Sequence, residues 1–278
     1  MMVFKNKIIK SHVSCDAEGK RAYLMNFDPD DFPVITDYLD DLAAINGYTK
    51  SFIKIQAKYA PAFFMSGYKM EAFVPRFYGG NEDAFFLAKY FDQERSQPEK
   101  QALSSFLQMI QCPLIRKNVL LDDEYSLKLL TESDTNAMTE VFKQVFDSYP
   151  FPIFDINFLF RAMKEGTRYY GIFHGVDLIA ISAAECDEKH QSAEMTDFAV
   201  LPEYRGKNFA FILLAAMEKD LLESGYITLF TIARLHAISM NKTFFNSGYH
   251  YSGTLHNNTN IAGSIESMNV WYKHLKVF

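Results

Sequence analysis

The stretch from Glu194 to Ala210 joins a short apolar strand, a turn that contains Pro202 and the start of a long apolar helix. At the head of the helix, Gly206 is flanked by the cations Arg205 and Lys207. The first backbone N–H groups of a helix have no partner within the helix, and the helix dipole favours negative charge there. Because a glycine also lets phosphate oxygens approach the backbone, this pattern predicts an α/β fold with a diphosphate-binding loop. The alternative is an ordinary strand-to-helix turn with two surface cations.

The loop Arg205–Ala210 resembles the acetyl-CoA signature of the GNAT acetyltransferases, Arg/Gln-x-x-Gly-x-Gly/Ala, which follows their central strand. Asn208 stands where that family usually has Gly. Since Asn tolerates positive φ better than most residues, we expect a slightly altered loop and not a lost one. The resemblance implies acetyl-CoA as the cofactor, with the backbone of Val200 binding the pantetheine arm and donating an N–H to the thioester oxyanion. The cofactor contacts that we expect are Phe198, Val200, Arg205, Gly206, Lys207, Asn208, Phe209, Ala210, Asn241 and Phe244.

Composition and charge narrow the class of protein. The chain has 278 residues, of which 49% are hydrophobic, which is enough for one large folded domain or two modest ones. Its formal net charge of −6 disfavours nucleic acid as a partner, and no apolar run is long enough for a membrane span. Cys15, Cys112 and Cys186 have neither metal-ligand nor disulfide spacing. We therefore expect a cytoplasmic protein with no metal site and no nucleic-acid or membrane partner, with a homodimer as an open option.

Apolar periodicity predicts that strands and helices alternate along the chain. Strands are expected at 3–12, 20–27, 51–55, 69–77, 83–91, 125–130, 168–173, 176–185, 192–200 and 228–233, with two more closing the chain. Helices are expected at 32–46, 56–66, 134–147, 155–165 and 208–224, with one more around Phe244 and one within 92–122. The aromatic link 149–154 and a loop at 257–263 are expected to roof the acceptor site.

Two parts of the chain share the same order of junctions. Gly47-Tyr48 and Gly67-Tyr68 follow the helices of the first part, and Gly225-Tyr226 and Gly248-Tyr249 follow those of the second. In each, the glycine is expected to end a helix and the tyrosine to start a strand. We interpret this as the duplication of a half-domain, although Gly-Tyr after a helix is common. Residues 27–33 replace the phosphate loop in the first part, where three Asp residues would repel a diphosphate.

The sequence thus predicts a partial GNAT-like domain at 1–91, a connector at 92–122 and a catalytic GNAT domain at 123–278. The expected fold is α/β (α+β), with a mixed twisted sheet flanked by helices. The first domain is expected to be a degenerate half that packs against the second or shapes a substrate cleft.

Acetyl transfer to an amine needs the neutral amine, and an alkylamine has a pKa of about 10.4, so a general base is expected. The resemblance implies that Glu194 is this base and that Asp197 binds an amine. Strand alternation places Glu194 on the same face as Val200 and Asp197 on the opposite face, but a β-bulge, usual in the family, could turn either inward. One of the two carboxylates could instead be a solvated residue at the strand end.

The last helix departs from the family pattern at two positions. The usual acid, a tyrosine, is replaced by Phe244, so Tyr249, another nearby tyrosine or water would protonate the leaving thiolate, unless it leaves without an acid. The helix-start asparagine of the family falls on Ala237. Asn241, one turn later, is the substitute that we expect, with an exposed helix residue as the alternative.

The whole chain is similar to the β-lysine N-acetyltransferases, which join a partial N-terminal half to a C-terminal GNAT domain, and the run 266–273 is its most specific segment. The resemblance implies transfer of acetyl to the ε-amine of β-lysine, giving the osmolyte Nε-acetyl-β-lysine. We expect Asp197 to hold an ammonium of this substrate and Arg234 its carboxylate, with Tyr149 and Phe151 also at the substrate. Arg234 as a surface residue is the alternative. Other acceptors (a polyamine, a diamine or lysine) and a non-catalytic acyl-CoA-binding module stay open.

Overall fold

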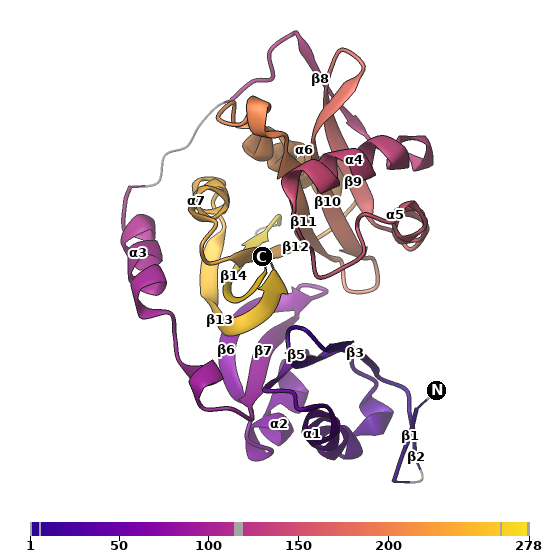
Figure 1. Ribbon diagram of the computed structural model, residues 1–278, viewed down its shortest axis with the longest axis vertical. Coiled ribbons are helices and arrows are strands. Elements are labelled where there is room, and N and C mark those ends of the chain that lie inside the picture. The colour runs from indigo at the N-terminus through magenta and orange to yellow at the C-terminus, as the bar shows by residue number, and fades with distance from the viewer. Residues whose placement is uncertain (1, 6, 114–118, 262, 277–278) are drawn as a thin grey trace.

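The computed structural model describes residues 2–5, 7–113, 119–261 and 263–276. Within them, the strands form a seven-stranded sheet in the C-terminal half, a five-stranded sheet in the N-terminal half and a two-stranded hairpin (Figure 1). The hairpin pairs β1 (Met2–Phe4) with β2 (Lys7–Ile9). Helix α3 (Lys100–Ile110) lies in the connector between the halves and contacts α7 (Ile238–Asn246).

The C-terminal sheet has the strand order β13-β14-β12-β11-β10-β9-β8. In chain order its strands are β8 (Tyr125–Leu129), β9 (Arg168–His174), β10 (Asp177–Asp187), β11 (Ser192–Val200), β12 (Thr228–Arg234), β13 (His250–Ile261) and β14 (Ser264–His274). All neighbouring strands are antiparallel except β11 and β12, which are parallel.

The parallel pair opens the middle of this sheet. Strands β11 and β12 are in register only from Ser192 opposite Thr228 to Glu194 opposite Phe230, although both continue beyond those residues. Past Glu194 the two strands no longer pair with each other, so this part of the sheet can admit a ligand between them.

Helices cover both faces of the C-terminal sheet. Six consecutive residues of β10, from Ile179 to Ala184, are fully buried, which requires cover on both sides. In Figure 1, α4 (Thr135–Val145) lies in front of the sheet, beside α5 (Ile156–Lys164), and α6 (Phe209–Glu223) lies behind it. Helix α6 buries Leu213, Leu214, Met217 and Leu221. Because these side chains anchor α6 to the sheet, its first residue, Phe209, has a fixed position near the gap between β11 and β12.

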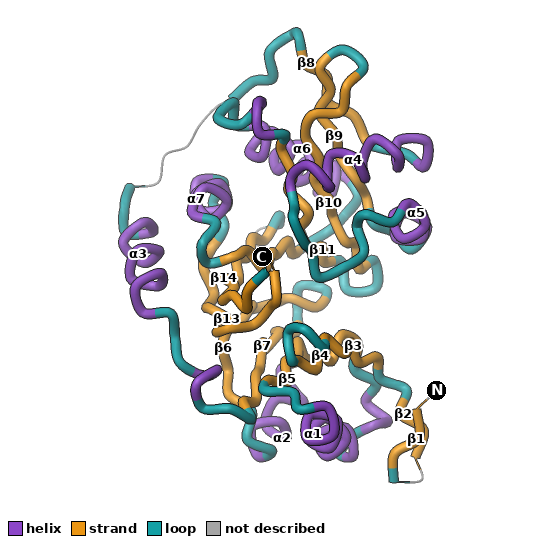
Figure 2. The backbone as a smooth tube through the Cα atoms, viewed as in Figure 1, coloured by secondary structure: helices purple, strands orange, loops and turns teal. Residues whose placement is uncertain are grey.

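The N-terminal sheet has the strand order β3-β4-β5-β7-β6. Its elements are β3 (His12–Asp16), β4 (Arg21–Asn26), α1 (Val34–Asn46), β5 (Lys50–Gln56), α2 (Ala60–Met65), β6 (Lys69–Tyr78) and β7 (Glu82–Tyr90). Figure 2 shows both helices on the side away from the C-terminal half. Five single-turn 3-10 helices among the described residues lie in connections, namely η1 (Pro29–Asp31), η2 (Ala57–Tyr59), η3 (Glu94–Ser96), η4 (Glu132–Asp134) and η5 (Pro202–Tyr204).

The order and direction of these five strands equal those of β10-β11-β12-β14-β13. In both sets the first pair is antiparallel, the second pair is parallel and the remaining two are antiparallel. A helix also follows the second strand and another follows the third in both sets. Duplication of a half-domain would produce this correspondence.

The two halves contact each other through the equivalent strands β6 and β13. A Cβ on Gly253 would lie 2.1 Å from the carbonyl oxygen of Glu71, so only glycine permits this approach. The buried ammonium of Lys50 lies 2.8 Å from the Glu71 carboxylate and donates to the carbonyl of His256 at 2.7 Å. A shared apolar cluster that includes Phe86 and Phe230 fills the space between the sheets.

Two predictions of secondary structure are wrong. The expected strand at 3–12 is broken, because the chain turns at Lys5, which has a φ of 46°, and the following residues form β2 and the start of β3. The expected roof loop at 257–263 is mostly strand, since β13 continues to Ile261 and the Asn257 amide donates to the carbonyl oxygens of Arg95 and Gln97. Residue 262 and part of the connector, 114–118, lie outside the described residues.

Candidate active site

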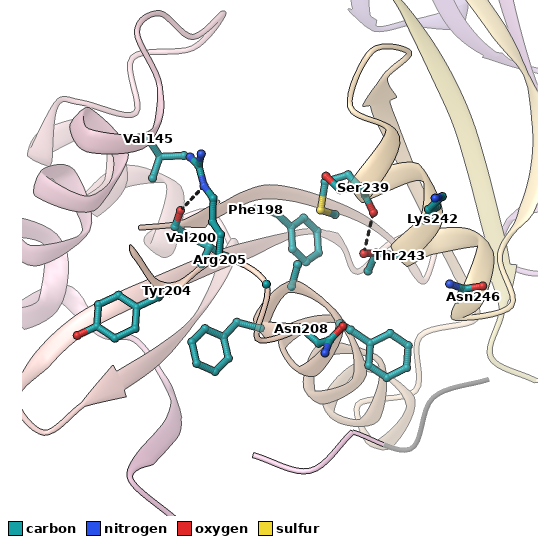
Figure 3. Close-up of a pocket in the computed structure, with 15 residues that line it drawn as sticks. Val145, Phe198, Val200, Tyr204, Arg205, Asn208, Ser239, Lys242, Thr243 and Asn246 are labelled. Carbon is teal, nitrogen blue, oxygen red and sulfur yellow. Dashed lines mark hydrogen bonds between the residues drawn. The ribbon is translucent and has the colours of Figure 1, made fainter. Parts of the chain in front are cut away.

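A cavity of about 620 Å³ lies between β11, the head of α6 and one face of α7 (Figure 3). It contains most of the cofactor contacts predicted from the sequence but not Lys207, Asn241 or Phe244. The residues that line it are Val145, Phe198, Val200, Tyr204, Arg205, Gly206, Asn208, Phe209, Ala210, Phe211, Ser239, Met240, Lys242, Thr243 and Asn246.

The loop between β11 and α6 has the backbone conformation that an anion-binding helix start needs. Gly206 has a φ of 86°, and Asn208, the N-cap residue of α6, has a φ of 61° and a ψ of 25°. The expected positive φ at Asn208 is thus present, so Asn replaces the usual Gly without a change of backbone region. Arg205 is held by a hydrogen bond from its Nε to the carbonyl oxygen of Val200 at 3.3 Å. The first N–H groups of α6 therefore face the cavity beside a cation.

Lys207 does not line the cavity. Its ammonium donates a hydrogen bond to the Tyr125 hydroxyl and lies 3.8 Å from the Glu124 carboxylate. Of the two predicted cations of this loop, only Arg205 therefore lines the cavity.

Helix α7 contributes a set of residues that reasoning from the sequence missed. One face of α7, with the spacing i, i+3, i+4, i+7, lines the cavity with Ser239, Lys242, Thr243 and Asn246. This spacing of polar residues is visible in the sequence and could have identified them. The predicted Asn241 lies on another face and is fully buried. Its amide donates to the carbonyl oxygens of Arg234 and Ala237 and accepts from Asn269 and Trp271. Its role is therefore structural, and its prediction as a cofactor contact is wrong.

Phe244 and Tyr249 lie behind the cavity wall. The Phe244 ring is edge-on to Phe198, and the Tyr249 ring is edge-on to Phe244, so Tyr249 is a layer further from the cavity. Tyr249 is 3% exposed, and burial beside the Glu218 carboxylate raises the pKa of its hydroxyl well above the usual value. This placement corrects the prediction of Tyr249 as the acid and of Phe244 as a direct cofactor contact.

A β-bulge in β11 places the predicted carboxylates. Thr196 pairs with Ala183 and Ala199 pairs with Ile181, so two residues of β11, Asp197 and Phe198, lie opposite one residue of β10. Asp197 takes a φ of 54° within this bulge. Simple alternation is therefore wrong beyond Thr196, because after the bulge Ala199, and not Val200, shares the face of Glu194.

Glu194 is part of a cluster of three carboxylates. Glu185, which the sequence did not single out, is its register partner across β10 and β11, so both side chains lie on one face. Enclosure, and to a lesser extent the charge of Asp197, raise the pKa of Glu194 to about 7. Partial removal from water and the charge of Glu194 raise the pKa of Glu185 to about 8, although its side chain remains exposed, and burial raises the pKa of Asp197. A carboxylate with a pKa of about 7 is suited to accept a proton at neutral pH.

The aromatic link holds Asp197. The Tyr149 hydroxyl donates to the Asp197 carboxylate at 2.6 Å, and Thr196 donates to the same oxygen at 3.3 Å. Tyr149 and Phe151 line a cavity of about 290 Å³ together with Tyr23 of the N-terminal half. The link thus joins the bulge of β11 to the cleft between the two halves.

Arg234 does not offer a free guanidinium to a ligand. Its Nε and Nη2 donate to the two carboxylate oxygens of Glu266 at 2.8 and 2.6 Å, in a bidentate pair between β12 and β14. Glu266 is buried, so its charge needs this partner. The prediction that Arg234 holds the substrate carboxylate is therefore replaced by a structural role.

Changing Arg234 to Ala is expected to lower the free energy of unfolding by about 1–3 kcal/mol, because it leaves the buried Glu266 carboxylate without its donors. Denaturant unfolding measures this change. Lys219→Ala is the control, since Lys219 is 78% exposed and 4.0 Å from Glu223, and we expect less than about 0.5 kcal/mol there. Unchanged stability of the Arg234 variant would return Arg234 to the ligand-binding candidates.

Known acetyltransferases are similar to this chain. Residues 134–242 match the family model described as the acetyltransferase (GNAT) family. The β-lysine N(6)-acetyltransferase of Methanococcus maripaludis is 35% identical to this chain over 255 residues, which cover 91% of this chain and 92% of that protein. The chain belongs to the GNAT family. It is an N-acetyltransferase that uses acetyl-CoA as acetyl donor and a small amine as acceptor.

Other relatives of this acetyltransferase extend the comparison. The N-acetyltransferase YodP of Bacillus subtilis is 32% identical over 220 residues, 78% of this chain and 76% of that protein. The crystal structure of the ribosomal-protein-S18-alanine N-acetyltransferase from Escherichia coli superposes with a TM-score of 0.50 at 14% identity. That structure covers 55% of this chain and 96% of its own, and the likeness shows the fold alone.

The chain's residues fit acetyl-CoA. The opening between β11 and β12, the cavity wall and the head of α6 together offer unpaired backbone groups, an apolar surface and the Arg205 cation. In the part of the chain that the structure describes, no group of His, Cys, Asp and Glu could hold a metal ion. None of the helices among those residues has the length and apolar composition of a membrane span.

Proposed function

We propose that this acetyltransferase acetylates the ε-amine of β-lysine to give Nε-acetyl-β-lysine. The observation that carries the proposal is the cluster of Glu185, Glu194 and Asp197 on β10 and β11, which suits an acceptor with more than one amine. The relative from Methanococcus maripaludis, which matches this chain over most of both lengths, is named for this substrate. A location in the cytoplasm, with free Cys15, Cys112 and Cys186, belongs to the same proposal.

In this proposal Glu194 accepts a proton from the acceptor ammonium, and the neutral amine would then receive the acetyl group of acetyl-CoA while the proton that this nitrogen loses passes to the departing thiolate. The cavity wall at Phe198 and Val200 orients the donor, and the head of α6 with Arg205 holds its diphosphate. Asp197, held by Tyr149, binds the second ammonium of the acceptor. No described side chain takes the role of acid, since a thiolate leaves well without one.

The test is turnover of pure protein with acetyl-CoA and equal concentrations of β-lysine, lysine and spermidine. We expect the highest kcat/KM for β-lysine, with the acetyl group on the ε-nitrogen of the product by NMR. A clear preference for lysine or spermidine would reject this acceptor. The three carboxylates favour a polyamine as the second candidate, because a polyamine carries ammonium groups only. Binding of acetyl-CoA without turnover of any amine would indicate a non-catalytic module instead.

We also infer that residues 1–91 are a degenerate half-domain, 92–122 a connector and 123–278 the catalytic domain. In the first half the buried Asp31 accepts hydrogen bonds from the backbone N–H groups of Lys10 and Ser11 at the place of the phosphate loop. We therefore expect one acetyl-CoA per chain by calorimetry. Two equivalent sites would contradict this interpretation. The oligomeric state, with a homodimer as one option, requires a separate measurement of mass in solution.

A further inference from the structure

The N-terminal half forms one wall of the cleft beside the carboxylate cluster. A cavity of about 720 Å³ lies between the ends of β4 and β5 and the hairpin of β10 and β11, and Lys54 and Asp187 are on opposite sides of it. The smaller cavity lined by Tyr149 has Tyr23 of β4 on its other side. The charge of Glu194 acts on both Lys54 and Tyr23, so this carboxylate lies near one lining residue of each cavity.

Lys54 is held in this cleft by aromatic rings. Its ammonium lies 4.5 Å from the centre of the Phe230 ring and 4.9 Å from that of Phe77. Phe230 is the residue of β12 that pairs with Glu194, at the point where β11 and β12 separate. The rings from both halves therefore fix a lysine of the N-terminal half next to the opening of the catalytic sheet.

Lys54 is a half-buried lysine of the described N-terminal sheet without a carboxylate in contact, whereas Lys69, which also forms no ion pair there, is exposed. Lys50, Lys58 and Lys89 each pair with an acidic side chain, whereas Lys54 forms no ion pair among the described residues. Burial lowers the pKa of Lys54, and the charges of Glu194, Asp187 and Glu185 oppose this shift. An ammonium that is partly removed from water without a contacting anion gains from an anionic ligand.

The charges of the cleft match a zwitterionic acceptor. The carboxylate cluster attracts the ammonium groups, and Lys54 is the lysine that the N-terminal half contributes to the lining of the cavity of about 720 Å³. Arg234, the cation predicted from the sequence, is occupied by Glu266. We propose that Lys54 binds the carboxylate of the acceptor amino acid, so that the N-terminal half-domain determines substrate specificity. This inference rests on the proposed function, because it requires an acceptor that carries a carboxylate.

The test uses acceptor pairs that differ only in the carboxylate: β-lysine with 1,4-diaminopentane, and lysine with 1,5-diaminopentane. For Lys54→Met we expect kcat/KM to fall roughly 10- to 100-fold for the amino acids, mainly through KM, and less than about 3-fold for the diamines. Lys54→Arg should recover part of the loss. Lys58→Met, which removes an exposed lysine that pairs with Glu82, is the matched control and should change neither. Calorimetry with acetyl-CoA checks that each variant is folded.

The outcomes separate the two proposals. Lys54→Met could lower kcat/KM equally for the amino acid and its diamine and move the acid limb of the pH profile to higher pH. Lys54 would then act only on the pKa of Glu194, and its role in binding the carboxylate would be rejected. No loss for either also rejects it. Wild type could prefer lysine to β-lysine, and Lys54→Met could lower kcat/KM for lysine but not for 1,5-diaminopentane. The β-lysine assignment would then fail, and the role of Lys54 would stand. If wild type accepts diamines only, both fail.

Discussion

Replacing Glu194 by Gln is expected to lower kcat/KM by about 10²- to 10⁴-fold, since a Gln cannot accept the proton of the acceptor ammonium. Acetyl-CoA binding should be unchanged, because Glu194 is not among the residues that line the cavity for the donor. The measurement is the steady-state rate with saturating acetyl-CoA, together with calorimetry for the donor. A variant that keeps wild-type kcat/KM would show that another group accepts the proton.

The pH profile gives a second readout of the same residue. The pKa of Glu194 is raised to about 7, so the carboxylate is protonated and inactive as a base below this pH. We expect the kcat/KM of wild type to fall as the pH drops through about 7. The residual activity of Glu194→Gln should instead keep rising with pH towards the pKa of the free amine, about 10.4, because only the neutral amine then reacts.

Glu185→Gln is the matched control for this assignment. Glu185 has the higher pKa of this pair and is largely protonated while Glu194 titrates, so its replacement by Gln should leave the acid limb of the pH profile near pH 7. The maximal rate should be retained. If Glu185→Gln lost the maximal rate and Glu194→Gln retained it, Glu185 and not Glu194 would be the general base.

Replacing Gly206 by Asp is expected to weaken acetyl-CoA binding by about 100-fold or more, which corresponds to about 2.7 kcal/mol. The new carboxylate would stand beside the head of α6, where the diphosphate is expected, and would repel it. A Cβ at this position meets no atom within 4 Å, so the variant should fold despite the strain of a φ of 86°. Calorimetry with acetyl-CoA measures the affinity.

Two neighbouring variants separate charge from backbone strain. Gly206→Ala keeps the strain but adds no charge, so we expect it to lose about 1–2 kcal/mol of stability and much less affinity than Gly206→Asp. Asn208→Gly should leave affinity near that of wild type, because a φ of 61° is easily adopted by glycine. Equal affinity in Gly206→Asp and wild type would place the diphosphate elsewhere.

Features that depend on a few neighbouring residues could be predicted from the sequence. The start of α6 follows from Gly206, Asn208 and the apolar run after them, since backbone preference and helix-end hydrogen bonds act over one turn. The end of α1 at Gly47, with a φ of 66°, follows from the same kind of local rule. The order of Gly-Tyr junctions also indicated two similar halves, and the strand orders of the two sheets agree with it.

Features that depend on residues far apart in the chain were decided by the tertiary structure. Arg234 was predicted to bind a ligand, but the register of β12 with β14 brings Glu266 within 2.6 Å of it. The position of Asp197 depends on a bulge that only the pairing with β10 defines.

Lys54 and Glu194 are separated by about half of the chain, and only the packing of the two halves brings their charges together. Local backbone preferences therefore determine where the donor loop forms, because the conformational energy of each residue there depends mainly on its own type. The arrangement of charges around the acceptor depends instead on strand register and on the contact between halves, to which many distant residues contribute.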